Sequence, residues 1–292
     1  MSINKHWFSL LIAAAALTVS AAEKKPWKDA YLSVGDIKIH YIEAGAGDHT
    51  LVFIPGLTMT AEVWKEQIPY FASRNYHIIA MDPRSQGLTT KTEQGNTYFQ
   101  HAADLVAFLK GLKLDRQQTT LIGWSAAVIT LLDYVSSPET GQPEHLVLVD
   151  GFPMMRKEAD YPWGVTVQQA RTTALSFEED RAKAGDKFVR SMFKAAQPEL
   201  LYKEMADASL KTPANTTVAL FFDLYTGDRR TALSKITAPT LIVVASESRG
   251  MGEYMHSQIG GSQLQVVDAG HALFLEKPQA FNQILEEFLS KF

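Results

Sequence analysis

The stretch that decides the fold is Leu121–Ala127, which reads L-I-G-W-S-A-A. The residues Thr119–Trp124 form an apolar, strand-like run, and Ala126–Val135 has the composition of a helix. The predicted strand therefore enters the predicted helix directly through Ser125. A sharp strand-to-helix turn of this kind is a nucleophile elbow, which lifts a serine hydroxyl above the edge of a sheet.

This turn is crowded, so the residues two positions before and after the serine must be small. Gly123 meets that requirement, and Ala127 stands where glycine is more usual. The alternative interpretation is an ordinary serine at a helix N-cap, where serine is common. Short motifs of this length also occur by chance.

Working outward from this motif, apolar strands alternate with helical patterns. The further predicted strands are Ile37–Glu43, Thr50–Ile54, Tyr76–Met81, His145–Asp150, Thr240–Ala245 and Leu264–Val267. The further predicted helices are Ala61–Phe71, His101–Leu112 and Ala280–Leu289. Strands rich in Val, Ile and Leu without alternation are buried on both faces, and helices between them indicate a parallel sheet. Strand pairs near the start can add antiparallel edges.

The rhythm changes between Gly151 and about Lys235, where no strand is predicted and large apolar residues are frequent. We therefore expect a helical insertion over residues 151–235. The sheet domain then comprises residues 23–150 and 236–292.

Two further segments carry candidate chemistry. Phe53–Thr58, F-I-P-G-L-T, follows a predicted strand, and its turn would present the backbone N–H of Leu57 toward Ser125. The N–H of Ala126 would be the second donor to an oxyanion, an arrangement in which one donor typically contributes ~3 kcal/mol. The alternative for this segment is a plain strand-ending turn. Near the C-terminus, His271 lies in a predicted loop after the last strand, within V-D-A-G-H-A-L-F-L.

These motifs together resemble the α/β-hydrolase superfamily from about residue 31 to the C-terminus, and the esterase, lactonase and non-haem chloroperoxidase-like branch in particular. The segments that carry the resemblance are P-G-L (55–57), D-P-R-S-Q-G (82–87), G-W-S-A-A (123–127), L-V-L-V-D (146–150), P-T-L-I-V-V (239–244) and A-G-H-A-L-F (269–274). The resemblance implies an α/β fold with a mostly parallel eight-stranded sheet, flanking helices and an inserted helical cap. It implies Ser125 as nucleophile, His271 as base, the chain order serine, acid, histidine, and no metal, haem or other cofactor.

The acid of the triad is the open question. In most relatives it follows the strand represented here by Thr240–Ala245, where Ser248 occupies the aligned position and Glu247 is its neighbour. Some relatives carry the acid after the earlier strand, which here ends at Asp150. We favour Asp150 and keep Glu247 as the alternative. Asp268 is too close in sequence to His271 to reach back to it easily, and we interpret it as structural.

Two other predictions concern the scaffold. Asp82 and Arg84 form a D-x-R turn after a strand, where we expect Asp82 to bond backbone groups and Arg84 to form a nearby ion pair. His40, His77 and His145 lie in strand-like runs and are interpreted as structural.

The helical insertion should cover the serine and supply an apolar pocket. For each candidate, packing within the core of the insertion is the competing explanation. The candidate substrate-binding residues are Trp124, Leu57, Met59, Phe152, Met155, Trp163, Met192, Phe193 and Phe222.

Bulk composition narrows the function class. The net charge is −4 without a marked run of Lys or Arg, so nothing suggests a nucleic-acid or anionic-membrane partner. There are no cysteines, which removes thiol catalysis and thiolate metal sites. Neither metal-ligand spacing nor a Gly-rich phosphate loop is evident.

The N-terminus has the order of a secretory signal peptide. Lys5 and His6 precede the apolar run Trp7–Val19, and small residues follow up to Ala22. We therefore expect residues 1–22 to be removed from a secreted or periplasmic protein without stable membrane association. An uncleaved anchor is the alternative.

The sequence thus predicts a serine hydrolase that cleaves a neutral, moderately apolar carboxylic ester. A lactonase or a C–C bond hydrolase on the same triad, and a catalytically silent fold that binds a small ligand, are the alternatives. Haloalkane dehalogenase and epoxide hydrolase chemistry are disfavoured, because both use Asp as the nucleophile where this chain has Ser125.

Overall fold

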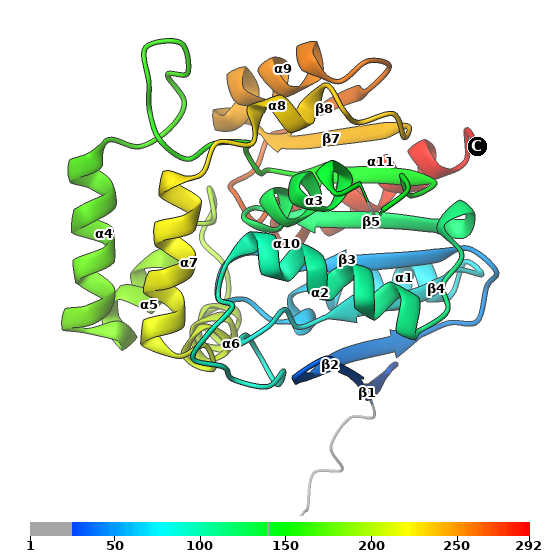
Figure 1. Cartoon of the computed structure of the whole chain (residues 1–292), viewed down its shortest axis with the longest axis horizontal. Helices are drawn as coiled ribbons and strands as arrows, with labels where there is room; N and C mark the ends of the chain where they lie inside the picture. The colour runs from blue at the N-terminus through cyan, green and yellow to red at the C-terminus, as the bar shows by residue number, and fades with distance from the viewer. Residues whose placement is uncertain (1–24, 139) are drawn as a thin grey trace, which may run out of the picture.

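A computed structural model describes residues 25–138 and 140–292, and an eight-stranded sheet forms its centre (Figure 1). The strands are β1 (Lys28–Val34), β2 (Ile37–Ala44), β3 (Thr50–Ile54), β4 (His77–Met81), β5 (Thr119–Trp124), β6 (His145–Val149), β7 (Thr240–Ala245) and β8 (Gln263–Val267). Their order across the sheet is β1-β2-β4-β3-β5-β6-β7-β8. β1 and β2 pair antiparallel, as do β2 and β4, and all other pairs are parallel. The predicted fold class is confirmed.

The inner strands are buried on both faces because helices cover both sides of the sheet. Leu121 of β5 packs into one apolar cluster with α2, α3, α8 and α9, and Ile122 packs into the other with α1, α10 and α11. The covering elements are the 3-10 turn η1 (Ala61–Trp64), α1 (Gln67–Ala72), α2 (Tyr98–Gly111), α3 (Ala127–Ser136), α8 (Arg230–Leu233), α9 (Arg249–Gln258), α10 (Leu273–Glu276) and α11 (Pro278–Leu289). Two short turns, η2 (Arg116–Gln118) and η3 (Ser246–Ser248), complete the connections.

The helical insertion lies between β6 and β7. Its helices α4 (Val167–Glu179), α5 (Arg181–Arg190), α6 (Glu199–Leu210) and α7 (Ala214–Thr226) pack together beside one end of the sheet (Figure 1). Helix α8 falls inside the range predicted for the insertion, 151–235, but Ala232 and Leu233 pack into the sheet core. The part of the insertion that packs outside the sheet core therefore ends before Arg230.

Two local predictions differ from the structure. The helix expected over Ala61–Phe71 is divided into η1 and α1. Pro69, in the first turn of α1, has no backbone N–H to bond the carbonyl of Lys65, which weakens a continuous helix through Lys65 and Glu66. Strand β1 was not predicted, because it is an edge strand whose residues are mostly exposed and carry little apolar pattern.

The register of the parallel strands gathers their carboxyl ends at one edge. The N–H of Ser125, directly after β5, donates to the Val149 carbonyl at 2.8 Å, and the N–H of Asp150 donates to Val243 at 2.8 Å. Backbone pairing thus continues past the ends of β5 and β6 and fixes the positions of both side chains.

In the described part of the chain, none of the helices has the length and apolarity to cross a membrane. The predicted signal peptide, residues 1–22, lies outside the described residues.

Candidate active site

Ser125 occupies a strained turn between β5 and α3. Its φ is +57°, a left-handed conformation that non-glycine residues rarely adopt and that is often retained at functional sites. The space at Gly123 is closed, because a Cβ there would lie 2.6 Å from Leu131 Cδ1. Gly56 is also confined, since its Cβ would lie 2.9 Å from the Cβ of Ser125. The turn therefore has the crowding that the L-I-G-W-S-A-A pattern predicted.

Three predicted residues meet at this turn. His271, in the loop between β8 and α10, has Nε2 at 2.8 Å from Ser125 Oγ and Nδ1 at 2.6 Å from Asp150 Oδ2. A carboxylate only accepts, so Nδ1–H donates to Asp150, and Nε2 is left to accept from the serine hydroxyl. The imidazole is thus held in the tautomer that a general base for Ser125 requires.

Asp150 is 3% exposed and has a second partner, because its Oδ1 accepts the backbone N–H of Ala245 at 2.8 Å. Its φ of +40° turns the side chain out of the line of β6. Glu247, the alternative acid, lies just after β7, and the described residues include no hydrogen bond from it to His271. It lines a cavity of about 170 Å³ together with Asp150 and His271. The carboxylate that contacts His271 is therefore that of Asp150.

The two predicted oxyanion donors are free within the described residues. Neither the N–H of Leu57 nor that of Ala126 donates to a protein acceptor there. Ala126 directly follows Ser125, and the preceding residue of the other loop, Gly56, lies against the serine side chain. The two N–H groups are thus available to an oxygen atom bound beside Ser125.

Gln86 supports the Gly56–Thr58 loop, a role that the sequence analysis did not identify. Its side-chain oxygen accepts the N–H of Thr58 at 2.6 Å, and its side-chain nitrogen donates to the Gly56 carbonyl at 3.4 Å. Thr58 has a φ of +63°, so this contact holds a strained residue in place. Gln86 is part of the D-P-R-S-Q-G motif, in which only Asp82 and Arg84 were assigned roles.

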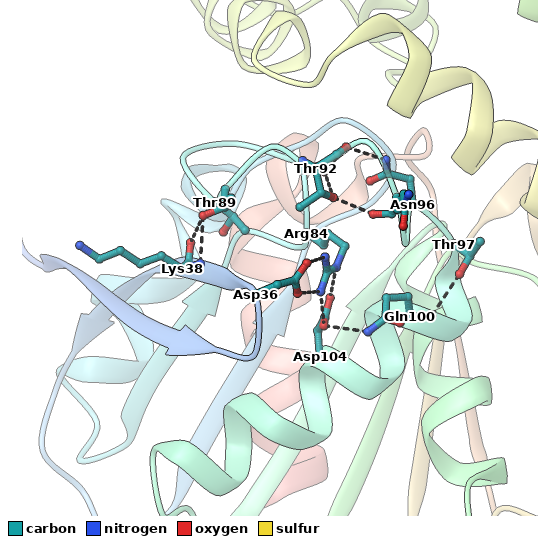
Figure 2. Close-up of polar contacts among 12 residues, drawn as sticks. Asp36, Lys38, Arg84, Thr89, Thr92, Asn96, Thr97, Gln100 and Asp104 are labelled. Atoms are coloured by element: carbon teal, nitrogen blue, oxygen red, sulfur yellow. Dashed lines mark hydrogen bonds and ion pairs between the residues drawn. The ribbon is translucent and has the colours of Figure 1, made fainter.

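Those two residues have the scaffold roles that were predicted. Asp82 accepts the backbone N–H groups of Ala61 at 2.7 Å and Leu88 at 2.7 Å. Figure 2 shows Arg84 between Asp104 and Asp36, with Nε donating to Asp104 at 2.7 Å and Nη2 donating to Asp36 at 2.8 Å. The hydrogen bonds that Arg84 donates to these two carboxylates raise the pKa of Arg84. Arg84 thus joins the β1–β2 turn to helix α2.

Glu276 is a second residue that the sequence analysis did not identify. Its carboxylate accepts three backbone N–H groups: Gly270 at 2.9 Å, Lys194 at 2.9 Å and Ala195 at 3.0 Å. The loop that carries His271 is thereby fastened to the segment between α5 and α6. Isolated Glu in a helix gives no sequence signal for such a role, because its partners are backbone groups distant in the chain.

The predicted substrate-binding residues fall into separate groups. Phe193 lines the cavity next to His271, and Phe152 and Met155 pack in the same cluster as Leu57 and Ala126. These residues adjoin the site.

Others of that set are core residues. Trp124 is completely buried, and its indole N–H donates to the His271 carbonyl at 2.9 Å. Met59 and Met192 are also buried within the core. The structure places these three residues in the core, where Met59 also lines a cavity with Val63 and Met205, and Trp124 supports the loop of His271.

Trp163 and Phe222 do not line the cavity next to His271. Trp163 packs against Tyr161 and against Tyr254 of α9, and Phe222 on α7 is 67% exposed. Asp268, interpreted as structural, pairs with Lys194 and accepts from Ser246 Oγ at 3.2 Å. It does not bond His271 in the described structure.

The chain belongs to the α/β-hydrolase family, whose model matches residues 51–284, and it is therefore a hydrolase with the fold described above. It is 26% identical over 277 residues to 3-oxoadipate enol-lactonase 2 of Acinetobacter baylyi, covering 89% of this chain and 96% of the relative. It is 23% identical over 290 residues to the human serine hydrolase BPHL, covering 94% of this chain and 89% of the relative. Among solved structures, an esterase of Exiguobacterium antarcticum shares the fold with a TM-score of 0.85, 24% identity, and coverage of 90% of this chain and 100% of that one.

Proposed function

We propose that this protein is a serine hydrolase that cleaves neutral, moderately apolar carboxylic esters through Ser125, His271 and Asp150. The observation that supports this proposal best is the pair of contacts made by His271, 2.8 Å to Ser125 Oγ and 2.6 Å to Asp150 Oδ2. Nucleophile, base and orienting acid in this connected order are the requirements of serine-dependent acyl transfer.

The reaction proceeds in two acyl transfers. His271 Nε2 takes the hydroxyl proton while Ser125 Oγ bonds to the ester carbonyl carbon, and the carbonyl oxygen becomes an oxyanion that accepts from the N–H groups of Leu57 and Ala126. The C–O bond to the alcohol then breaks, and His271 gives its proton to the leaving alcohol. A water molecule, deprotonated by the same nitrogen, attacks the acyl carbon; the bond to Ser125 Oγ then breaks, the serine oxygen takes the proton from His271, and the acid is released. Asp150 stabilises the imidazolium in both steps.

The substrate class follows from the charge and apolarity around Ser125. Leu57, Phe152, Met155 and Phe193 are apolar neighbours of the site. Lys194 is the one Lys or Arg among the described residues that line the cavity of His271, and it is paired with Asp268. Among the described residues of the site, no Lys or Arg is thus free to pair with a substrate carboxylate or phosphate, and this favours a neutral acyl group. Helices α4–α7 are proposed to act as a cap over this site.

A lactone is the second candidate substrate, because the same chemistry opens a cyclic ester and one relative is named as an enol-lactonase. In a lactone the leaving alcohol stays attached to the acyl group. Comparison of an open-chain ester with a lactone of the same carbon number distinguishes the two.

The test is hydrolysis of p-nitrophenyl esters from acetate to decanoate, with labelling by a fluorophosphonate. Wild type is expected to turn over these esters and to be labelled at Ser125, whereas Ser125→Ala loses both. Ser191→Ala is the matched control, because Ser191 lines the cavity beside His271 without contacting it in a hydrogen bond. Folded protein that is neither labelled nor active on esters or lactones would replace this proposal with a ligand-binding or C–C hydrolase function.

We also propose that residues 1–22 direct export and are removed. N-terminal sequencing of protein from a secretion-competent host is expected to begin after Ala21 or Ala22. An intact N-terminus in the membrane fraction would instead indicate an anchor.

A further inference from the structure

A cluster of metal-ligating side chains lies at the opposite edge of the sheet from Ser125. His49 directly precedes β3, and Glu144 and His145 stand at the start of β6. Strand β5 lies between β3 and β6 and contributes Thr120. The amino ends of three neighbouring parallel strands thus bring two imidazoles and one carboxylate together, although His49 is distant in the sequence from Glu144 and His145.

The possible ligand atoms are about as far from one another as two ligands of the same metal ion. One ligand atom from each of the three residues lies within 4.8 Å of the other two. His49 Nδ1 and Glu144 Oε2 are 3.1 Å apart. Two ligands about 2.1 Å from a tetrahedral ion stand about 3.4 Å from each other, so small side-chain rotations suffice to enclose an ion.

The cluster leaves a polar atom unsatisfied in the absence of a cation. Glu144 Oε2 is buried and accepts no hydrogen bond from the described residues, because His49 Nδ1 is near but not aligned for one. A buried carboxylate oxygen without a donor is costly.

The hydroxyl group of Thr120 lies between the two imidazoles. Thr120 Oγ1 lies 2.8 Å from His49 Nε2 and 3.2 Å from His145 Nδ1. An acceptor for the remote N–H of His49 fixes its ring and leaves Nδ1 as the ligand, which is the usual outer-shell arrangement of a metal-bound histidine.

We propose that His49, Glu144 and His145 form a binding site for one divalent transition-metal ion, with Zn²⁺ as the best match to two imidazoles and one carboxylate. Water completes the coordination, since the side chains of His49 and Glu144 are 24% and 30% exposed. The ion would tie β3 to β6 across β5. Because β5 runs from this edge to Ser125 over about 16 Å, the site is stabilising and separate from the hydrolytic reaction.

The test is metal binding by the untagged protein after treatment with a chelator. Calorimetric titration with Zn²⁺ is expected to show one site, and Co²⁺ is expected to give the visible absorption of a low-coordinate nitrogen and oxygen environment. His49→Gln and Glu144→Gln should each weaken binding at least about tenfold. His77→Gln is the matched control, because His77 forms a similar pair with Glu43, 2.9 Å apart, at the start of the adjacent strand β4. It should bind Zn²⁺ like the wild type.

The readout is independent of hydrolysis, so failure of the proposed function would leave it intact. Circular dichroism shows whether each variant is folded, and the Co²⁺ spectrum of the wild type provides a test that needs no variant. Absence of saturable binding in the wild type would overturn the proposal. So would binding that survives in both variants, or an equal loss in the His77→Gln control.

Discussion

Glu276 offers a sharp test of how the loop of His271 is held. Its carboxylate is the shared acceptor for Gly270, which directly precedes His271, and for Lys194 and Ala195 of the insertion. Removing the carboxylate in Glu276→Ala leaves three backbone N–H groups without their acceptor. We expect the loop to shift relative to Ser125, although no atom of Glu276 contacts the serine in the structure.

The size of the effect can be worked from these three bonds. A hydrogen bond to a charged group contributes ~1.5–3 kcal/mol, but the site is only half-buried and water can replace part of each bond. We therefore expect Glu276→Ala to lower the free energy of unfolding by about 3–4 kcal/mol. Glu276→Gln, which keeps one acceptor oxygen, should lose about half as much. A 1 Å displacement of a catalytic group can cost ~10²-fold in rate, so kcat should fall ~10- to 100-fold in the alanine variant.

The assay combines urea unfolding with kinetics on p-nitrophenyl butyrate. The decrease should appear mainly in kcat, because the apolar neighbours of Ser125 are unchanged. Glu286→Gln is the control: Glu286 lies on α11 and its partners are the side chains of Tyr70 and Arg74, away from the His271 loop. If Glu276→Ala loses stability but keeps its kcat within a factor of about two, the carboxylate supports folding alone and the reasoning on His271 is wrong.

Three further predictions concern the acid, the turn and a buried histidine. Asp150→Asn should lower kcat ~10³- to 10⁴-fold on p-nitrophenyl esters by favouring the wrong imidazole tautomer, whereas Glu247→Gln should remain near wild type; the reverse result would make Glu247 the acid. Gly123→Ala should lower the free energy of unfolding by about 1–3 kcal/mol in urea, because its Cβ would lie 2.6 Å from Leu131 Cδ1; unchanged stability would show that the turn can relax. Burial lowers the pKa of His101 to about 4, so between this pH and the ordinary pKa near 6.5 the unfolded chain binds more protons than the folded chain. The free energy of unfolding should therefore fall by about 1–2 kcal/mol from pH 7 to pH 5, and less steeply in His101→Gln. If urea melts give the same dependence of this free energy on pH for both proteins, the expectation is contradicted.

The fold was largely predictable because the inner strands have a local signal. Thr50–Ile54, Thr119–Trp124 and Thr240–Ala245 are apolar after their leading threonines, and the structure places these three strands within the predicted limits. An edge strand has no such signal, which explains why Lys28–Val34 was missed. The end of the insertion could not be predicted from the sequence pattern, since it depends on the packing of Ala232 and Leu233 into the sheet core.

The site was predictable where a residue acts through its position at a strand end. Ser125 and Asp150 follow β5 and β6 directly, and backbone hydrogen bonds carry both into place. The position of the Asp150 carboxylate depends on its φ of +40° and on the hydrogen bond that it accepts from the N–H of Ala245, and no sequence motif predicts either feature. Trp124 was one of the candidate residues for an apolar substrate pocket. Only the packed structure shows its indole below the loop of His271.

The same contacts explain why the helical insertion and the hydrolytic centre should not be considered separately. Ser209 on α6 donates to Thr58 Oγ1 at 2.9 Å, beside the predicted oxyanion donor, and the Met192 carbonyl accepts the N–H of Ala272 at 2.9 Å, next to His271. The insertion is therefore bonded to the loops on both sides of Ser125. A movement of these helices that opens the site to substrate must strain or break bonds that position the reacting groups. In this fold, the elements that would select the substrate also set the geometry of its hydrolysis.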